Sequence, residues 1–113
     1  MATNLFFKEL DKYPQEFRIP YTSNIPTIGY LYDLYPNAIT LADNIFFDTN
    51  NYEWLSNDKP FIHYEPVSYQ YYFNSNSDFS KFQLHIKSLY QQYTIARKQA
   101  LLYYKLKQIE LDF

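Results

Sequence analysis

Cysteine is absent from this chain of 113 residues, and glycine occurs only once, as Gly29. Without cysteine, the chain forms no disulfide, no thiolate zinc site and no thiol nucleophile, which fits a reducing compartment. A single glycine excludes the glycine-rich loops that cradle phosphates and the Gly-x-Ser-x-Gly turn that presents a catalytic serine. Several large classes of active site are therefore excluded from the start.

Long apolar runs are also missing. No run approaches the ~18–20 residues that a helix needs to span a bilayer. The first nine residues, from Met1 to Glu9, lack the charged-then-apolar order of a secretory signal peptide, and they are not the Arg-rich, acid-poor sequence of a transit peptide. We therefore expect an intracellular protein without a transmembrane segment.

Aromatic residues are abundant, with 14 Tyr, 10 Phe and 1 Trp. A tyrosine ring buries a large apolar area, but its hydroxyl needs a hydrogen-bond partner. A Tyr-rich chain therefore favours partly hydrated contacts and protein interfaces over a dry core. Codon usage offers a second explanation. Residues with AT-rich codons (Phe, Tyr, Met, Ile, Asn, Lys) number 51, whereas Gly, Ala, Arg and Pro number 14. The source genome is then AT-rich, and mutation pressure supplies part of the tyrosine.

The net charge of −2 is unevenly distributed. Residues 1–77 carry −5 and residues 78–113 carry +3. The two parts either attract each other, which we prefer, or each meets an oppositely charged neighbour.

Prolines divide the first part of the chain into short elements. We expect a helix over residues 5–10, capped by Thr3 or Asn4 and ended by Tyr13-Pro14, because the residue before proline avoids the helical region. Residues 18–26 predict an extended strap that is anchored by Ile19, Tyr21 and Ile25. Residues 27–34 predict a second short helix, although Gly29 lies inside it, and Pro36-Asn37 predicts a turn.

Strands are expected between residues 38 and 73. The candidates are residues 38–41, 45–48, 52–55, 61–64 and 67–73, and the first of these could equally continue as a helix toward Asn44. Residues 45–48 and 52–55 predict a hairpin around an Asn-rich turn, and the alternation of Val67, Tyr69, Tyr71 and Phe73 with polar neighbours predicts a strand with one apolar face. The predicted fold is α+β and helix-dominated. Its single domain comprises straps, short helices and strands over residues 1–76 and a helix over residues 77–113.

The C-terminal segment predicts one long amphipathic helix. Ser77 or Asp78 caps it, and no Pro or Gly follows. Its apolar residues step by three and four along one seam, as in a coiled coil, and the seam then shifts to Leu102, Leu106, Ile109 and Phe113. At ~1.5 Å per residue the helix is about 50 Å long. A compact chain of this size has a radius of gyration of only ~13 Å.

We therefore expect part of the seam to contact another protein; the alternative is that the helix covers its own sheet throughout. Ala96 and Ala100 mark a place where a second helix could approach closely. The predicted partner-binding residues are Phe82, Ile86, Leu89, Tyr93, Ala96, Ala100, Tyr103, Leu106 and Ile109. The bases expected on the opposite, solvated face are Lys81, Lys87, Arg97, Lys98, Lys105 and Lys107.

Residues capable of chemistry are few. His63 and Glu65 share one face of a strand, but a zinc deaminase would also need a Pro-Cys-x-x-Cys motif. Two histidines, His63 and His85, do not specify a metal site. The available carboxylate pairs are Asp43 with Asp48 and Glu53 with Asp58. General acid–base chemistry would require a pocket and perturbed pKa values. We expect no enzyme, no cofactor and no metal.

Nucleic-acid binding is a second alternative. Tyrosine rings interleaved with bases suit single strands. The rings are Tyr90, Tyr93, Tyr103 and Tyr104, and the bases are Arg97, Lys98, Lys105 and Lys107. The chain as a whole is slightly acidic, however, against the basic footprint of such proteins.

The sequence thus favours a non-enzymatic accessory subunit of a larger assembly, with other protein subunits as partners and self-association of the helix also open. A mitochondrial complex of an AT-rich protist is the setting we prefer. The alternatives are a small viral or phage protein that binds a host protein, and a single-stranded nucleic-acid-binding protein.

Overall fold

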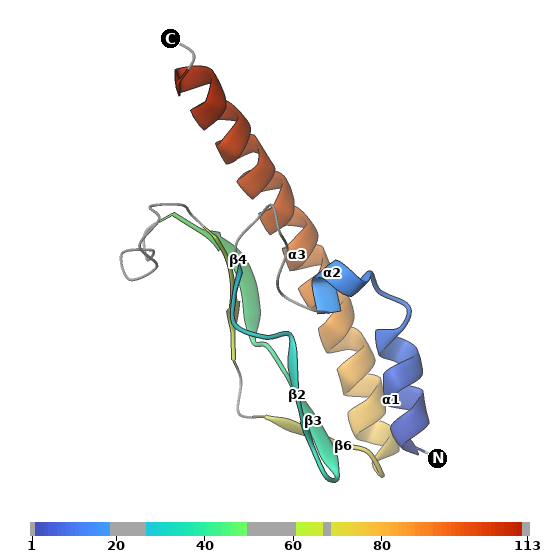
Figure 1. Cartoon of the computed structure of the whole chain (residues 1–113). Coiled ribbons are helices and arrows are strands. Elements are labelled where there is room, and N and C mark those ends of the chain that lie inside the picture. Colours follow the sequence, from blue (N-terminus) through green and yellow to red (C-terminus); the bar gives the residue numbers. More distant parts are fainter. Residues whose placement is uncertain (1, 19–26, 50–60, 67–68, 112–113) are drawn as a thin grey trace.

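The computed structural model in Figure 1 describes residues 2–18, 27–49, 61–66 and 69–111. The molecule is elongated, with principal dimensions of 58 × 26 × 19 Å and a radius of gyration of 16.1 Å. The helices are α1 (Ala2–Leu10), α2 (Gln15–Arg18) and α3 (Asn76–Leu111). The strands are β1 (Thr27–Ile28), β2 (Tyr32–Tyr35), β3 (Ala38–Leu41), β4 (Asn44–Asp48), β5 (Phe61–Glu65) and β6 (Gln70–Tyr72). The α+β, helix-dominated fold predicted from the sequence is confirmed.

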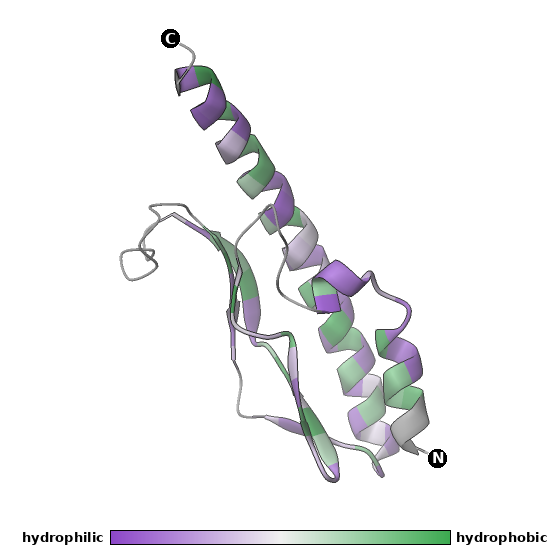
Figure 2. Ribbon diagram, viewed as in Figure 1, coloured by the Kyte–Doolittle hydropathy of each residue, from purple (hydrophilic) through white to green (hydrophobic). Residues whose placement is uncertain are grey.

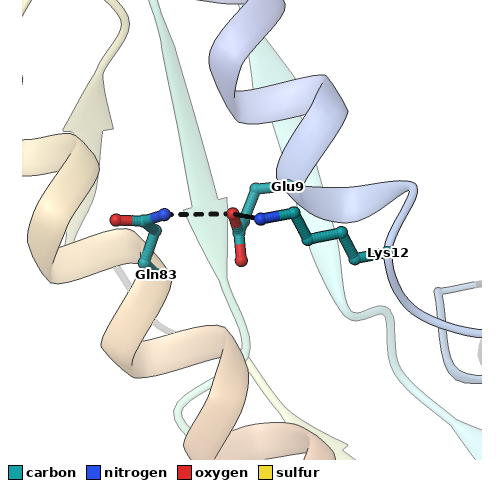
Figure 3. Close-up of polar contacts among 3 residues, drawn as sticks. All are labelled: Glu9, Lys12 and Gln83. Carbon is teal, nitrogen blue, oxygen red and sulfur yellow. Dashed lines mark hydrogen bonds and ion pairs between the residues drawn. The ribbon is translucent and has the colours of Figure 1, made fainter.

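The two short helices pack against the first half of α3 (Figure 1). The predicted helix over residues 5–10 is confirmed but begins at Ala2, so Thr3 and Asn4 lie within it and not at its cap. A polar contact fixes α1 to α3: the carboxylate of Glu9, which is 8% exposed, accepts hydrogen bonds from Gln83 Nε2 at 3.1 Å and Lys12 Nζ at 3.0 Å (Figure 3). The predicted strap lies outside the described residues beyond Arg18.

Strands replace the helix predicted over residues 27–34. Gly29 has a φ of 97°, which is incompatible with a right-handed helix. A Cβ on Gly29 would lie 2.2 Å from the backbone oxygen of Tyr64, so β1 approaches β5 closely only because this residue is glycine. The turn predicted at Pro36-Asn37 is confirmed and joins β2 to β3 in an antiparallel hairpin.

Within the described residues, six strands form two small sheets, in the orders β1-β5-β4 and β2-β3-β6. The strands predicted over residues 38–41, 45–48 and 61–64 are confirmed as β3, β4 and β5. β4 pairs antiparallel with β5, with Phe46 opposite His63. The hairpin partner predicted for β4, residues 52–55, lies outside the described residues. β6 covers only Gln70–Tyr72 of the strand predicted over residues 67–73, of which Val67 and Ser68 are also outside.

Helix α3 is continuous over 36 residues. Its N-cap is Ser75, whose Oγ accepts a hydrogen bond from the amide of Asp78 at 3.2 Å. The prediction of Ser77 or Asp78 as the cap is therefore wrong by two or three residues. The carboxylate of Asp78 instead accepts a hydrogen bond from the backbone amide of Tyr72 at 2.8 Å. This bond joins the start of α3 to β6.

The core lies between α3, the sheets and the short helices. Aromatic rings dominate the N-terminal end, where Phe6 of α1 contacts Phe73, Phe79 and Phe82 at centroid distances of 4.8–5.3 Å. A hydrogen bond also joins α3 to β4: the Gln92 side-chain oxygen accepts it from the backbone amide of Ile45 at 2.8 Å. Each ion pair among the described residues lies within one of the two charge segments, residues 1–77 or 78–113, so polar and ring contacts join the two segments.

Candidate protein-interaction surface

Helix α3 presents three sides. One meets the sheets: His85 Nδ1 lies 2.7 Å from the Tyr71 hydroxyl, and Tyr103 packs edge-on against Phe47 at 5.6 Å. A second meets α1 and α2, where Tyr90 packs against Phe17 at 5.1 Å. At 3.6 residues per turn, the third side faces away from both.

The C-terminal end of α3 extends beyond the body of the molecule (Figure 1). Ala100 is buried, and no residue from Leu101 to Glu110 is buried. We call residues 101–110 the projecting end. At ~1.5 Å per residue it is about 15 Å long. Figure 2 shows hydrophobic and hydrophilic bands alternating along it.

Exposed aliphatic side chains line the third side of α3 and continue onto the projecting end. Their exposed fractions are 58% for Ile95, 58% for Leu102, 51% for Leu106 and 45% for Ile109. Steps of seven, four and three residues keep these four on one side of the helix, roughly opposite the buried seam. We call them the outer stripe. The apolar pattern therefore does not continue along one face: it crosses to the opposite face near residue 100.

The predicted partner-binding residues divide at the same point. The structure buries the first six in the chain's own core, with exposures of 0–3%. They are Phe82, Ile86, Leu89, Tyr93, Ala96 and Ala100. Since Ile45 contacts Gln92 and Phe47 contacts Tyr103, β4 runs beside the segment that holds the two alanines. Among the predicted residues, Leu106 and Ile109 remain exposed, and Tyr103 is half-buried. Phe113 lies outside the described residues.

The bases of α3 do not all share the solvated face. Arg97 is half-buried beside Tyr93; burial raises the pKa of Tyr93, and the charge of Arg97 offsets part of that rise. Lys107 lies on the core side of the projecting end, where its Nζ is 5.5 Å from the Tyr103 ring and 3.5 Å from the Glu110 carboxylate. The prediction of a solvated base was therefore wrong for Arg97, which is half-buried, whereas Lys107 is exposed although it lies on the same side of α3 as the seam.

Tyrosines considered for base stacking already have ring partners. Tyr90 and Tyr93 both pack against Phe17 of α2, at 5.1 and 5.4 Å. Tyr93 is 3% exposed. Tyr103 lies between β4 and Lys107. Tyr90, Tyr93 and Tyr103 thus pack within the fold, and they do not line an open path for successive bases.

His63 and Glu65 lie on β5, both half-buried. The His63 ring stacks on Phe46 with centroids 5.0 Å apart and an interplanar angle of 18°. Its Nδ1 is 3.9 Å from the carboxylate of Asp48, which is 6% exposed. His63 also forms part of the wall of a groove of about 350 Å³ between the two sheets, whereas Asp48 lies outside that wall. The groove is lined mainly by apolar and tyrosine side chains, Tyr30, Tyr32 and Tyr35 among them.

Of the carboxylate pairs proposed from the sequence, the described one, Asp43 with Asp48, does not converge. Asp43 immediately precedes β4 and Asp48 ends it, so about 16 Å of extended chain separates them. Glu53 and Asp58 lie outside the described residues. His85 is half-buried, and burial lowers its pKa while the Ala42 backbone and the Asp43 charge oppose that shift. Within the described residues, no group of three His, Asp or Glu side chains could hold a metal ion.

No protein-family model, curated protein or solved structure matches this chain. Among the helices that the structure describes, none combines the length and the apolar character required to cross a bilayer.

Proposed function

We propose that this chain is a non-enzymatic accessory subunit of a larger protein assembly, and that the projecting end of α3 docks it there. One observation carries the proposal. The projecting end buries no residue, yet it holds Leu101, Leu102, Leu106 and Ile109, which are 45–58% exposed. Exposed aliphatic residues that gather on one element mark a contact with another molecule.

The physics of an unsupported helix strengthens the proposal. Most helical stability in proteins comes from tertiary packing of an apolar face, and short isolated helices are marginal in water. Among the described residues of the projecting end, the two half-buried tyrosines pack against the chain's own body: Tyr103 contacts Phe47, and Tyr104 lies against the core. A partner that covers the outer stripe would supply the missing packing and remove its aliphatic side chains from water.

A catalytic function has less support. His63 is stacked on Phe46, and Asp43 and Asp48 lie at opposite ends of β4. His85 hydrogen-bonds to Tyr71 between α3 and β6 and thereby contributes to packing. The partners we propose are other protein subunits, and the AT-rich composition favours a protist organelle complex as the setting. The same surface would serve a viral protein that binds a host protein.

Site-specific photocrosslinking tests this proposal. A photoreactive amino acid replaces Leu106 in one variant and Leu34 of β2, which is 52% exposed, in the control. After irradiation in cells of the native source, we expect a discrete protein adduct at position 106 and none at position 34. Adding Leu102→Glu should abolish the adduct. Equal crosslinking at the two positions, or an adduct that survives Leu102→Glu, would refute docking through this end.

A further inference from the structure

The outer stripe has the repeat of a coiled coil. Ile95, Leu102 and Ile109 recur every seven residues, with Leu106 between the last two. Another helix of the same period covers such a stripe along its whole length. An irregular protein surface would meet one or two of these residues. Because this chain itself carries a helix of the matching period, it is one candidate for its own partner.

We propose that the outer stripe pairs two copies of this chain through their α3 helices, parallel and in register. This rests on the proposed function, since it names a second copy as the occupant of the same surface. The sheets and short helices pack on the other sides of α3, so two copies can meet along the helix without contact between their bodies.

Charges beside the outer stripe select the parallel orientation. One flank carries Lys98 and Lys105, and the other carries Tyr103 and Glu110. In a parallel pair, opposite flanks meet, so Lys105 faces Glu110 of the second copy. In an antiparallel pair, like flanks meet, and the lysine rows oppose each other. Attraction therefore belongs to the parallel pair and repulsion to the antiparallel one.

Gln99 selects the register. It is exposed and lies one heptad before Leu106, in the layers that alternate with those of Leu102 and Ile109. In register, the Gln99 amides of the two copies face each other and can hydrogen-bond. A slip of one heptad would place Gln99 against Leu106 instead. One polar layer of this kind fixes the alignment of a coiled coil at a cost in affinity.

The size of the stripe sets the strength of the pair. Four aliphatic side chains of about half exposure fall short of the ~800 Å² per partner that a standard interface buries. We therefore expect a reversible dimer that forms at roughly tens of micromolar, at the transient end of interface sizes.

Disulfide trapping tests orientation and register, because the natural chain contains no cysteine. Ile95→Cys and Ile109→Cys are each oxidised in the full chain, with Tyr30→Cys, at a position 72% exposed, as the control. The parallel pair predicts that each α3 variant forms a disulfide dimer on its own and that the control stays monomeric. Disulfides that form only when the two α3 variants are mixed would show an antiparallel pair and overturn the proposal.

Sedimentation equilibrium separates failure of this inference from failure of the proposed function. We expect the mass to rise with concentration in the natural chain, Leu102→Glu to abolish the rise, and Leu34→Glu to leave it unchanged. Gln99→Leu should strengthen the dimer by roughly tenfold or more, because it removes the polar layer. A chain that stays monomeric and gives no disulfide dimer refutes self-pairing. The docking function still stands if position 106 photocrosslinks to a different protein, and it falls if no adduct forms.

Discussion

Two leucines on the same helix provide the sharpest test of which side of α3 belongs to the core. Leu89 is fully buried, whereas Leu102 is 58% exposed on the outer stripe. Each is replaced by Ala, which keeps the helix and removes the same atoms. If α3 covers its own sheets as the structure shows, the two substitutions will have very different effects on the free energy of unfolding.

The magnitudes follow from burial. Leu89→Ala removes three buried carbons at ~0.8 kcal/mol each and leaves a cavity, so we expect a loss of about 3 kcal/mol. Leu102→Ala removes a side chain that is less than half buried, and Ala is the better helix former, so the loss should stay below about 1 kcal/mol. In a chain of this size, the first change lowers Tm by roughly 10 °C or more.

Urea unfolding followed by far-UV circular dichroism measures both values. The concentration is kept in the low micromolar range so that the proposed dimer does not contribute. A loss below about 1 kcal/mol for Leu89→Ala would contradict the packing described above. It would mean that the seam faces solvent in the isolated chain and needs a partner along its whole length.

Three further outcomes are expected. Gly29→Ala should destabilise the chain by about 2 kcal/mol or more, since a positive φ and a 2.2 Å approach to the Tyr64 oxygen both oppose a side chain; thermal unfolding measures it. Ser75→Ala should cost roughly 0.5–2 kcal/mol through loss of the N-cap of α3, and an unchanged stability would refute the cap. Burial raises the pKa of Tyr64 and Tyr93 above 10.0 in the folded chain, so the unfolded chain loses these protons first and stability falls as pH rises through about 10. Tyr64→Phe should lessen that fall, and an alkaline unfolding curve identical to that of the natural chain would contradict it.

Several elements were predictable because their signals are local. The absence of Pro and Gly after residue 77 predicted a continuous α3, and Pro36-Asn37 predicted the turn before β3. The prediction of a helix over residues 27–34 was wrong, because the spacing of apolar residues gives no information on the backbone conformation that Gly29 adopts. The prediction of the N-cap residue of α3 was also wrong. Ser75 and Asp78 have the three-residue spacing of a capping box, and this signal in the sequence could have identified Ser75 as the cap.

By itself, the sequence determined which residues share a face of α3, because the period of the helix follows from backbone geometry. It also showed that the apolar pattern shifts near residue 100. Only the tertiary structure decided what covers each face. The sheets and the short helices that the structure describes pack over the helix as far as Ala100 and bury Leu89 and Ala100, and they leave Leu102 and Ile109 in solvent. The reason is that burial depends on contacts between residues far apart in the chain, which the spacing of one helix does not record.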